Sequence, residues 1–570
     1  MKNARSSKRC APVSALYKPG GLTRDPRASM IRAMPEPSRR GALARFLQSN
    51  TASQSVAAAA GIVAFGFVAS RLLGLLRSVA IARAFGTDPE LSAYWVAFRL
   101  PDLVFQVLAG ATLSAAFIPT FSRVRLRFGE RAGWDLASAV LNLISIATTF
   151  AAVLAFVLAP WIVPLLAPGL GADTGREAEL RSLAVDLTRV MLLSPILFGV
   201  SGMVTGILNA RNHFLAPALA PVFYNLSIIV AALFLAGPWG IQGLALGVVA
   251  GSALHLLVQL PALRAVGMRW TPTFDIASTG VAEVARLMGP RVVGLAAAQF
   301  NFVVVVFFAS FVSDEAISAL NYAFLMAMLP VGVVGMAIST AVFPSMAQQA
   351  AAQQIESLRD SVAHSLRLIL FLAIPASAGL ALLAEPAVRL LFERGAFSAA
   401  STDLVWPLLV VYGVAVFAHA GIEILSRGYY ALADTRTPVL FAVLAVALNV
   451  ALCAAFVAPF GLRGLAAATS VAAVVEFLLL LVVLERKLGG LRNRGVTTSA
   501  LRTVAATAVM AEVMVLLSMV LRAAGIDIHS LGGALLLTAG GGVAGFFAFA
   551  FACAQVRSQE YRELTGRLLG

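Results

Sequence analysis

The chain has 570 residues, of which 59% are hydrophobic and only 12% are charged. A soluble domain carries about 25% charged residues, so this composition excludes a water-soluble globular protein. The formal net charge is +15, and the basic residues lie in short segments between long apolar runs. We therefore interpret them as membrane-topology signals and not as a nucleic-acid surface. The three cysteines are widely separated, without the spacing of a metal site or a disulfide framework.

Residues 1–54 differ in composition from the rest of the chain, because they are rich in Arg, Lys and Pro and contain no long apolar run. We expect no secretory signal peptide here, since such a peptide needs a hydrophobic segment. The segment is predicted to be a disordered cytoplasmic extension. The alternative is a cytoplasmic arm that touches anionic lipid.

From residue 55 onward, apolar runs recur almost to the C-terminus, each close to the length of about 20 residues that spans a bilayer. Their length favours helices, because the strands of a membrane β-barrel are shorter and alternate in polarity. We predict an all-α membrane protein with about fourteen transmembrane helices. The predicted spans are 57–83, 91–119, 137–160, 183–208, 214–236, 240–262, 286–311, 316–344, 364–383, 403–426, 438–457, 463–484, 500–522 and 531–555.

Charge in the connecting loops predicts the orientation of these helices. With a cytoplasmic N-terminus, three segments fall inside: the loop 121–135, the loop after the twelfth predicted helix, and the C-terminal tail. All three are rich in Arg or Lys. The outside loops 86–90 and 237–240 contain no basic residue, whereas the outside segment 384–403 contains two. We predict a multi-pass membrane protein with both termini in the cytoplasm.

A weak internal repeat relates the two central parts of the chain. The motif Ser114–Pro119 resembles Ser339–Pro344, and Asn225 in the fifth predicted helix corresponds to Asn449 in the eleventh. A shift by six helices preserves orientation, so the repeats are predicted to be parallel. The alternative is chance similarity between short apolar strings.

The repeat divides the chain into predicted domains. Residues 55–263 form an N-lobe of helices 1–6, residues 264–485 form a C-lobe of helices 7–12, and residues 486–570 form helices 13–14 and a basic cytoplasmic tail. Two six-helix lobes that face each other across a central cavity are an architecture of secondary transporters.

Two arginines inside the first predicted span are the strongest functional candidates. Arg71 and Arg77 flank Gly74, and an arginine at membrane depth costs at least about 2.5 kcal/mol on insertion scales. Such residues face protein or water, and guanidinium groups bind phosphate oxygens in a bidentate manner. We predict that Arg71 and Arg77 bind an anionic, pyrophosphate-linked lipid. Arg99, which precedes Pro101 in the second span, either joins this substrate site or lies in the membrane interface.

Other titratable residues also fall inside predicted spans. Glu423 and Glu476 are intramembrane carboxylates that could pair with an arginine or bind a coupling cation, and the sequence names no partner for either. His255 and His419 are expected to be hydrogen-bonded packing residues, with proton relay as the alternative. The sequence contains no P-loop, zinc-protease or serine-hydrolase motif, so we expect no enzyme activity, no cofactor and no bound metal.

Five groups of residues, in order along the chain, resemble the lipid II flippases (the MurJ/MviN family). They are Ser70–Arg77 with Ala82–Gly86, Val96–Leu103, Ser114–Pro119, Leu208–Phe214 with Pro221–Asn225, and Leu391–Phe397 with Tyr429–Pro438. The resemblance runs from about residue 56 to residue 485.

The resemblance implies an alternating-access transporter of the multidrug/oligosaccharidyl-lipid/polysaccharide exporter superfamily. Its implied substrate is lipid II, an undecaprenyl-pyrophosphoryl disaccharide-pentapeptide, moved from the cytoplasmic to the outer leaflet for peptidoglycan synthesis. The cavity arginines of the family's first helix map onto Arg71 and Arg77, and the last two helices are implied to form a groove for the lipid tail. The implied partners are this undecaprenyl-pyrophosphate-linked glycan lipid, membrane lipids and optionally a coupling ion, without nucleic acid.

The sequence departs from the family pattern at several charged positions. Ser78 and Ser92 stand where the family has Asp, Phe105 and Gln106 where it has Arg, and Glu423 where it has a Lys-like residue. The alternatives are therefore a flippase for another lipid-linked glycan and a transport-deficient membrane scaffold of the cell-wall machinery. A small-molecule exporter of the same superfamily is disfavoured, because it needs an anionic cavity.

Overall fold

All secondary structure in the described chain is helical, as the all-α class predicts. A computed structural model describes residues 56–108, 111–273, 280–491 and 495–569, so the predicted extension 1–54 lies outside the described residues. The helices are α2 (Val56–Phe85), α3 (Pro89–Leu108), α4 (Ala111–Leu166), α5 (Glu177–Met191), α6 (Leu193–Ala210), α7 (Leu215–Val230), η1 (Ala231–Leu235), α8 (Ala236–Leu257), α9 (Leu260–Ala265), α10 (Val281–Ala309), α11 (Ala316–Pro330), η2 (Val331–Met336), α12 (Ala337–Ala351), α13 (Ile355–Leu382), α14 (Ala384–Phe392), α15 (Ala399–Val414), α16 (Val416–Ala431), α17 (Arg436–Leu488), α18 (Val496–Ala523), α19 (Leu531–Gln555) and α20 (Gln559–Leu569).

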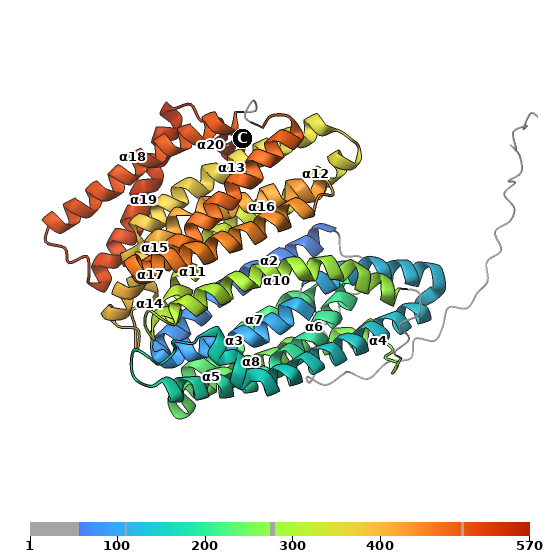
Figure 1. Cartoon of the computed structure of the whole chain (residues 1–570). Coiled ribbons are helices and arrows are strands. Elements are labelled where there is room, and N and C mark those ends of the chain that lie inside the picture. Colours follow the sequence, from blue (N-terminus) through green and yellow to red (C-terminus); the bar gives the residue numbers. More distant parts are fainter. Residues whose placement is uncertain (1–55, 109–110, 274–279, 492–494, 570) are drawn as a thin grey trace, which may run out of the picture. The chain divides into compact units, whose positions relative to one another are not determined.

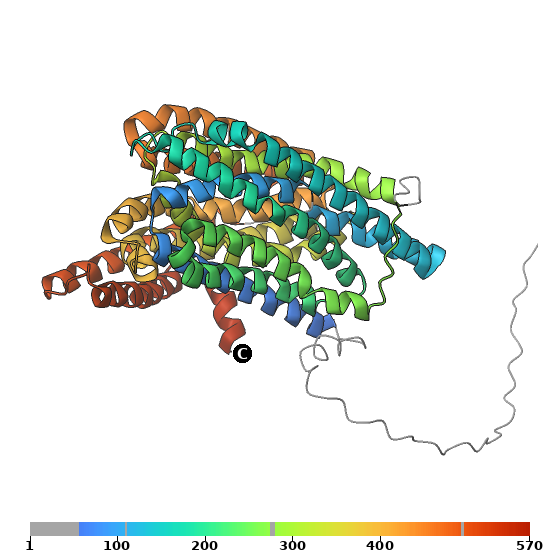
Figure 2. The ribbon, with the colours of Figure 1, turned by 90° about the horizontal axis from the view of Figure 1, so that it is seen from below.

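The helices form two groups with α10 between them (Figure 1). In the N-half (α2–α9), α2 packs on α7 and α4 packs on α6; in the C-half (α11–α17), α16 packs on α13 and α17. Helix α10 contacts α3 and α4 of the N-half and α17 of the C-half, while α18 packs on both α13 and α19. Figure 2 shows long helices of both halves running side by side, as membrane-crossing helices do.

By length and composition, nine helices of the described chain, or ten if the bent pair α15–α16 is one span, can cross a membrane. This count is lower than the predicted number of about fourteen. Two of the candidates, of 51 and 53 residues, are each long enough for two crossings. Each folds back at a glycine with non-helical φ and ψ, Gly240 in α8 and Gly461 in α17.

Two further helices account for the remaining difference. Helix α3 covers most of a predicted span but carries Glu90, Arg99 and Asp102, which lower its hydropathy. Within α10, only the segment Gln299–Ala309 counts as an apolar helix, and it is too short to cross a membrane by itself. The omission of α3 is informative, because its charged residues belong to the candidate site described below.

Equivalent hydrogen bonds and turns support the predicted parallel repeat. Asn225 Nδ2 of α7 lies 3.5 Å from the Ser70 carbonyl oxygen of α2, and Asn449 Nδ2 of α17 lies 2.7 Å from Asn301 Oδ1 of α10. Helix α7 therefore contacts α2 in the first copy of the repeat, and α17 contacts α10 in the second copy in the same way. The glycines at which the two hairpins turn also match, with φ of 55° at Gly240 and 53° at Gly461.

The segment 384–403, whose two arginines fit the predicted orientation poorly, contains the short helix α14. Arg389 in this helix is buried, and its guanidinium lies 3.5 Å from Glu385 and 3.0 Å from Glu393. This helix was not predicted, because at nine residues it is too short to give a clear sequence pattern. Arg389 therefore forms ion pairs within this segment, and its presence here is not a signal of membrane orientation.

Loops of the two halves meet at one end of the bundle and form what we call the loop seal (residues 83–87, 167–174, 310–315 and 395–401). The Gly171 N–H donates to Asp314 Oδ1 at 2.6 Å, and the Thr174 hydroxyl donates to Asp314 Oδ2 at 2.6 Å. The Ala396 N–H donates to the Arg83 carbonyl oxygen at 2.9 Å. Bonds from several loops therefore hold the halves together at this end.

Candidate functional site

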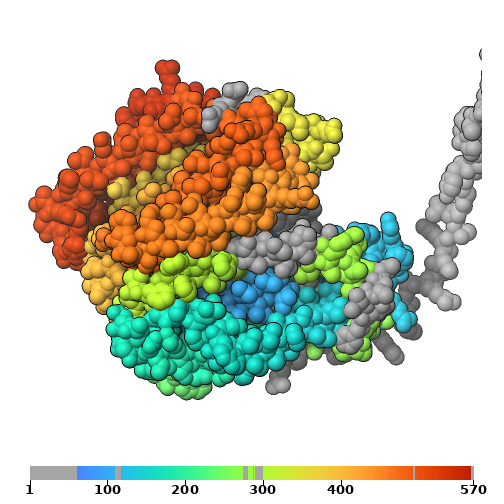
Figure 3. Space-filling model, in the orientation of Figure 1, coloured from blue at the N-terminus to red at the C-terminus, as the bar shows by residue number. Residues whose placement is uncertain are grey.

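Arg71 extends from α2 of the N-half to η2 of the C-half. Its Nη2 lies 3.6 Å from Met336 Sδ, and its Cζ lies 5.1 Å from the centroid of the Phe67 ring. The side chain is exposed, and no ion pair that the structure gives for the described residues includes it. In Figure 3, blue atoms of the first described helices are visible between the two halves. An accessible, unpaired guanidinium between two halves can take a phosphate as its ligand.

Arg77 lines a separate cavity of about 260 Å³ inside the N-half. Tyr94, Asp102 and Tyr224 line the same cavity, so its polar groups come from α2, α3 and α7. Among the described residues, the buried Nε of Arg77 has no hydrogen-bond partner. A buried cationic donor without an acceptor is costly, so this geometry favours a bound acceptor such as water or an anion.

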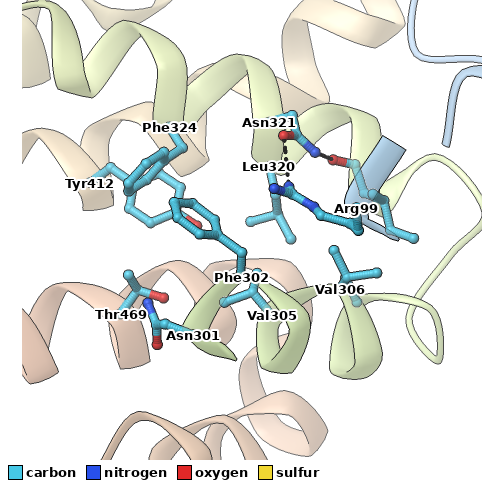
Figure 4. Close-up of a pocket in the computed structure, with 12 residues that line it drawn as sticks. Arg99, Asn301, Phe302, Val305, Val306, Leu320, Asn321, Phe324, Tyr412 and Thr469 are labelled. Atoms are coloured by element: carbon cyan, nitrogen blue, oxygen red, sulfur yellow. Dashed lines mark hydrogen bonds between the residues drawn. The ribbon is translucent and has the colours of Figure 1, made fainter. Parts of the chain in front are cut away.

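Arg99 lies in the contact between the N-half and the α10–α11 region (Figure 4). Its Nη2 donates to Asn321 Oδ1 at 3.1 Å, and its guanidinium lies over the Phe302 ring at 5.1 Å. The neighbouring cavity measures only about 30 Å³, which is room for no more than a few water molecules. The structure thus separates Arg99 from Arg71, and its role as a substrate ligand stays a prediction.

Arg427 is a cation that the sequence analysis missed. It lies one helical turn after Glu423 in α16, and its Nη1 donates to Glu423 Oε2 at 2.5 Å. Its Nη2 donates to Thr340 Oγ1 of α12 at 3.1 Å. The spacing of four residues between Glu423 and Arg427 is typical of a helical ion pair, so the sequence held the signal for this contact.

Neutral polar residues form a small network beside Arg99. Asn449 accepts weak hydrogen bonds at 3.5 Å from Cys453 and Thr469, and it donates to Asn301. This network connects helices α10 and α17 through neutral side chains.

Among the described residues, no group of three or more His, Cys, Asp or Glu could hold a metal ion.

One of the intramembrane histidines is placed by the structure as predicted. His255 Nδ1 lies 2.7 Å from Ser201 Oγ, and its ring packs edge-to-face on Phe198. The expectation of a hydrogen-bonded packing residue is confirmed for His255. Glu476 lies in α17, and its role in proton or cation binding stays a prediction.

Acidic residues gather around the loop seal. Burial raises the pKa of Glu315, and the negative charges of Asp88, Asp173 and Asp314 raise it further. Burial also raises the pKa of Asp88, as does the nearby charge of Glu90. A carboxyl with a raised pKa binds its proton more tightly in the sealed arrangement than when the loops separate.

We expect acidification to favour the sealed arrangement. The sign follows from linkage: the sealed state binds more protons, so it gains stability as the pH falls toward the ordinary value of 4.5 for a Glu and loses stability as the pH rises. Spin labels on cysteines that replace the exposed residues Ala178 and Ala400 would report the separation of the loops. Cys10 is changed to Ser so that it is not labelled, and Cys453 and Cys553 are buried. The short-distance population should be larger at acidic than at alkaline pH, and Glu315→Gln should remove most of the difference. An unchanged pH response in that variant contradicts the assignment.

The comparisons with known sequences converge on one family. A family model described as "Lipid II flippase MurJ" matches residues 81–532. A probable lipid II flippase MurJ of Rhizobium tropici is 33% identical over 432 residues, covering 73% of this chain and 79% of that protein. The lipid II flippase MurJ of Burkholderia cenocepacia is 31% identical over 436 residues, covering 75% of this chain and 82% of that protein. The matched region of the family model begins after Arg71 and Arg77.

Solved structures agree on the fold. A lipid II flippase MurJ in an inward closed conformation superposes with a TM-score of 0.73 at 24% identity, covering 88% of this chain and 99% of that one. An inward-facing multidrug resistance MATE family transporter of the MOP superfamily superposes with a TM-score of 0.61 at 16% identity, covering 79% of this chain and 99% of that one. Together with the sequence matches, these findings establish that the chain belongs to the MurJ family of lipid II flippases.

Proposed function

We propose that this chain moves lipid II from the cytoplasmic to the outer leaflet of the bacterial inner membrane for peptidoglycan synthesis. The observation that carries the proposal is the pair Arg71 and Arg77 on α2, within a fold shared with a solved lipid II flippase. One guanidinium is accessible and unpaired, and the other has a buried Nε without a partner among the described residues. Both therefore suit the oxygens of a pyrophosphate.

The transport step follows from the need to keep charge away from hydrocarbon. Two phosphates crossing the bilayer interior unaided face a large desolvation cost. A head group that passes between the halves stays with water and guanidinium groups, while the polyprenyl tail remains in lipid. Rocking of the two halves then exposes the head group alternately to either side.

An apolar groove beside the C-half supports a place for the lipid tail. It measures about 460 Å³ and lies between α13, α16, α17 and α18, where Leu370, Phe477 and Val504 are among its lining residues. The surface of this groove is mostly apolar, as a polyprenyl chain requires. Its location includes α18, in keeping with the tail groove that the family resemblance implies.

We also propose that both termini lie in the cytoplasm. The loop seal then lies on the outer side, and the arrangement of the halves is inward-facing. The basic segments after residues 120 and 485 support this orientation. A coupling ion stays a prediction.

Complementation tests the proposed function directly. The full chain is expressed in a bacterium depleted of its own lipid II flippase, and growth is scored together with cleavage of lipid II by a degrading enzyme added outside the cells. Growth and cleavage should both return. If neither returns while the chain is inserted at normal abundance, lipid II transport by this chain is refuted.

A flippase for another lipid-linked glycan is the second candidate, and the neutral residues at family-charged positions favour it. Ser92 and Ser318 share a hydrogen bond of 3.0 Å across the halves, and the Ser78 hydroxyl donates to the Gly74 carbonyl oxygen. These serines now serve helix contacts, so they do not supply the charges that the family has there. Restored growth without surface-accessible lipid II would favour this candidate.

A further inference from the structure

Two cations, one from each half, contact neighbouring turns of the same helix in the C-half. Arg71 of α2 reaches Met336 at the end of η2. Arg427 of α16 reaches Thr340 of α12, four residues further along. One helical turn of about 5.4 Å separates the two contact points.

The two guanidinium groups differ in how they are neutralised. Arg427 is held by the Glu423 carboxylate at 2.5 Å and by the Glu423 carbonyl oxygen at 2.9 Å. Among the described residues, the Arg71 guanidinium contacts a thioether and an aromatic ring and forms no ion pair with a carboxylate. The C-half thus carries its own anion beside its cation, while the cation of the N-half is open to an external anion.

The Glu423–Arg427 pair is accessible. The side chains are 32% and 20% exposed, and Thr340 is exposed as well. An accessible ion pair exchanges its carboxylate for another anion at low cost, because neither charge has to be buried alone. A phosphate that offers two oxygens to a guanidinium fork is a stronger ligand than a single carboxylate oxygen.

We propose that Arg427 is a second substrate-binding cation, and that Glu423 is an internal anion that the substrate displaces. A pyrophosphate has two phosphoryl groups, so one is held by Arg71 and Arg77 of the N-half and the other by Arg427 of the C-half. The bound head group then links α2 to α16 and draws the halves together at the end opposite the loop seal. This inference rests on the proposed function and adds a specificity-determining residue to it.

The position of Glu423 makes Arg427 selective for its ligand. Without its carboxylate, Arg427 would attract any cellular anion, including inorganic phosphate. With the carboxylate in place, a ligand must displace Glu423 before it binds, so a divalent anion that also reaches Arg71 is favoured over a monovalent one.

Binding measurements on the full chain in nanodiscs test this proposal. The probe is undecaprenyl pyrophosphate, which lacks the glycan, and undecaprenol is the neutral control. Arg427→Gln should weaken pyrophosphate binding by about tenfold or more, since hydrogen bonds to charged groups are being lost. Glu423→Gln should strengthen it several-fold, because the competing carboxylate is removed. The double variant should behave like Arg427→Gln alone, and undecaprenol binding should not change.

Two further variants keep the result interpretable. Arg189→Gln removes a guanidinium that lies 3.8 Å from Asp186 on the N-half, and it should leave the affinity unchanged. Arg427→Lys keeps the charge but loses the planar fork, so its affinity should fall between those of the wild type and Arg427→Gln.

The outcomes separate this inference from the proposed function. If Glu423→Gln and Arg427→Gln lower affinity and thermal stability together, the pair is a structural brace and the inference fails. If the chain restores growth in the depleted bacterium but the variants bind like wild type, only the inference fails. If complementation fails while the expected order of affinities holds, the head group of the substrate is wrong and the role of Arg427 stands.

Discussion

Replacing both Arg71 and Arg77 with alanine should abolish the growth that the unmodified chain supports in a flippase-depleted bacterium. Each guanidinium is expected to contribute charge-assisted hydrogen bonds to the head group, worth about 1.5–3 kcal/mol each. Loss of both should therefore lower transport by at least about a hundredfold. Each single variant should retain intermediate transport, because one cation remains.

The structure argues that this loss would not come from misfolding. Arg71 contacts a methionine sulfur and a phenylalanine ring, and Arg77 Nε has no hydrogen-bond partner in the described chain. Arg83→Ala on the same helix is a matched control, because only the backbone oxygen of Arg83, not its side chain, accepts the bond from Ala396. Full growth of the double variant at wild-type membrane abundance would show that these arginines do not carry transport.

The fold was largely predictable because hydrophobicity and charge are read directly from the chain. Apolar runs gave an all-helical membrane protein, which the structure and the MurJ relatives confirm. The motif match also predicted a transporter and not an enzyme, as the family shows. The hairpins at Gly240 and Gly461 show the limit of counting, since a helix assignment can continue through a glycine at which the chain reverses.

The sequence points to candidate site residues only where a single residue is conspicuous, and the substrate role of these residues stays a prediction. Arg71 and Arg77 stand out because arginines are rare in apolar runs. Arg427 was missed although Glu423 was recognised as an intramembrane carboxylate, and a search four residues along the helix would have found its partner. Arg99 shows a different limit: its hydrogen-bond partner Asn321 lies 222 positions away in the sequence, so only the fold reveals this contact between helices.

The loop seal could not be predicted, because its bonds join loops that are distant in sequence. Asp314 accepts from residues 140 and 143 positions earlier in the chain. No periodicity or motif marks such a residue, which looks like an ordinary acidic residue in a connecting loop. Its burial, with 2% of its surface exposed, follows from how the loops pack together and not from a local sequence pattern.

Asp314→Ala should therefore open the loop seal and impair transport severely. The carboxylate accepts from the N–H groups of Gly171 at 2.6 Å and Thr174 at 3.0 Å, and from the Thr174 hydroxyl. The Gly171 N–H is buried, and a buried donor left without a partner costs about 1–3 kcal/mol, so losing these bonds should shift the equilibrium away from the sealed arrangement by about tenfold or more. The spin-label distance between Ala178 and Ala400 should lengthen, and complementation should fall by more than tenfold.

Gly169→Ala offers an independent route to the same outcome, because it keeps Asp314 intact. A Cβ on Gly169 would lie 2.3 Å from the Ser310 carbonyl oxygen, a backbone atom that can move only if the loops separate. Gly237→Ala is the matched control, since a Cβ there has no atom within 4 Å in the described structure. If Gly169→Ala and Asp314→Ala both keep the short spin-label distance and full growth, closure of these loops is not a step in transport. If both lengthen the distance and stop growth while Gly237→Ala does neither, the alternating-access cycle depends on closure at this end.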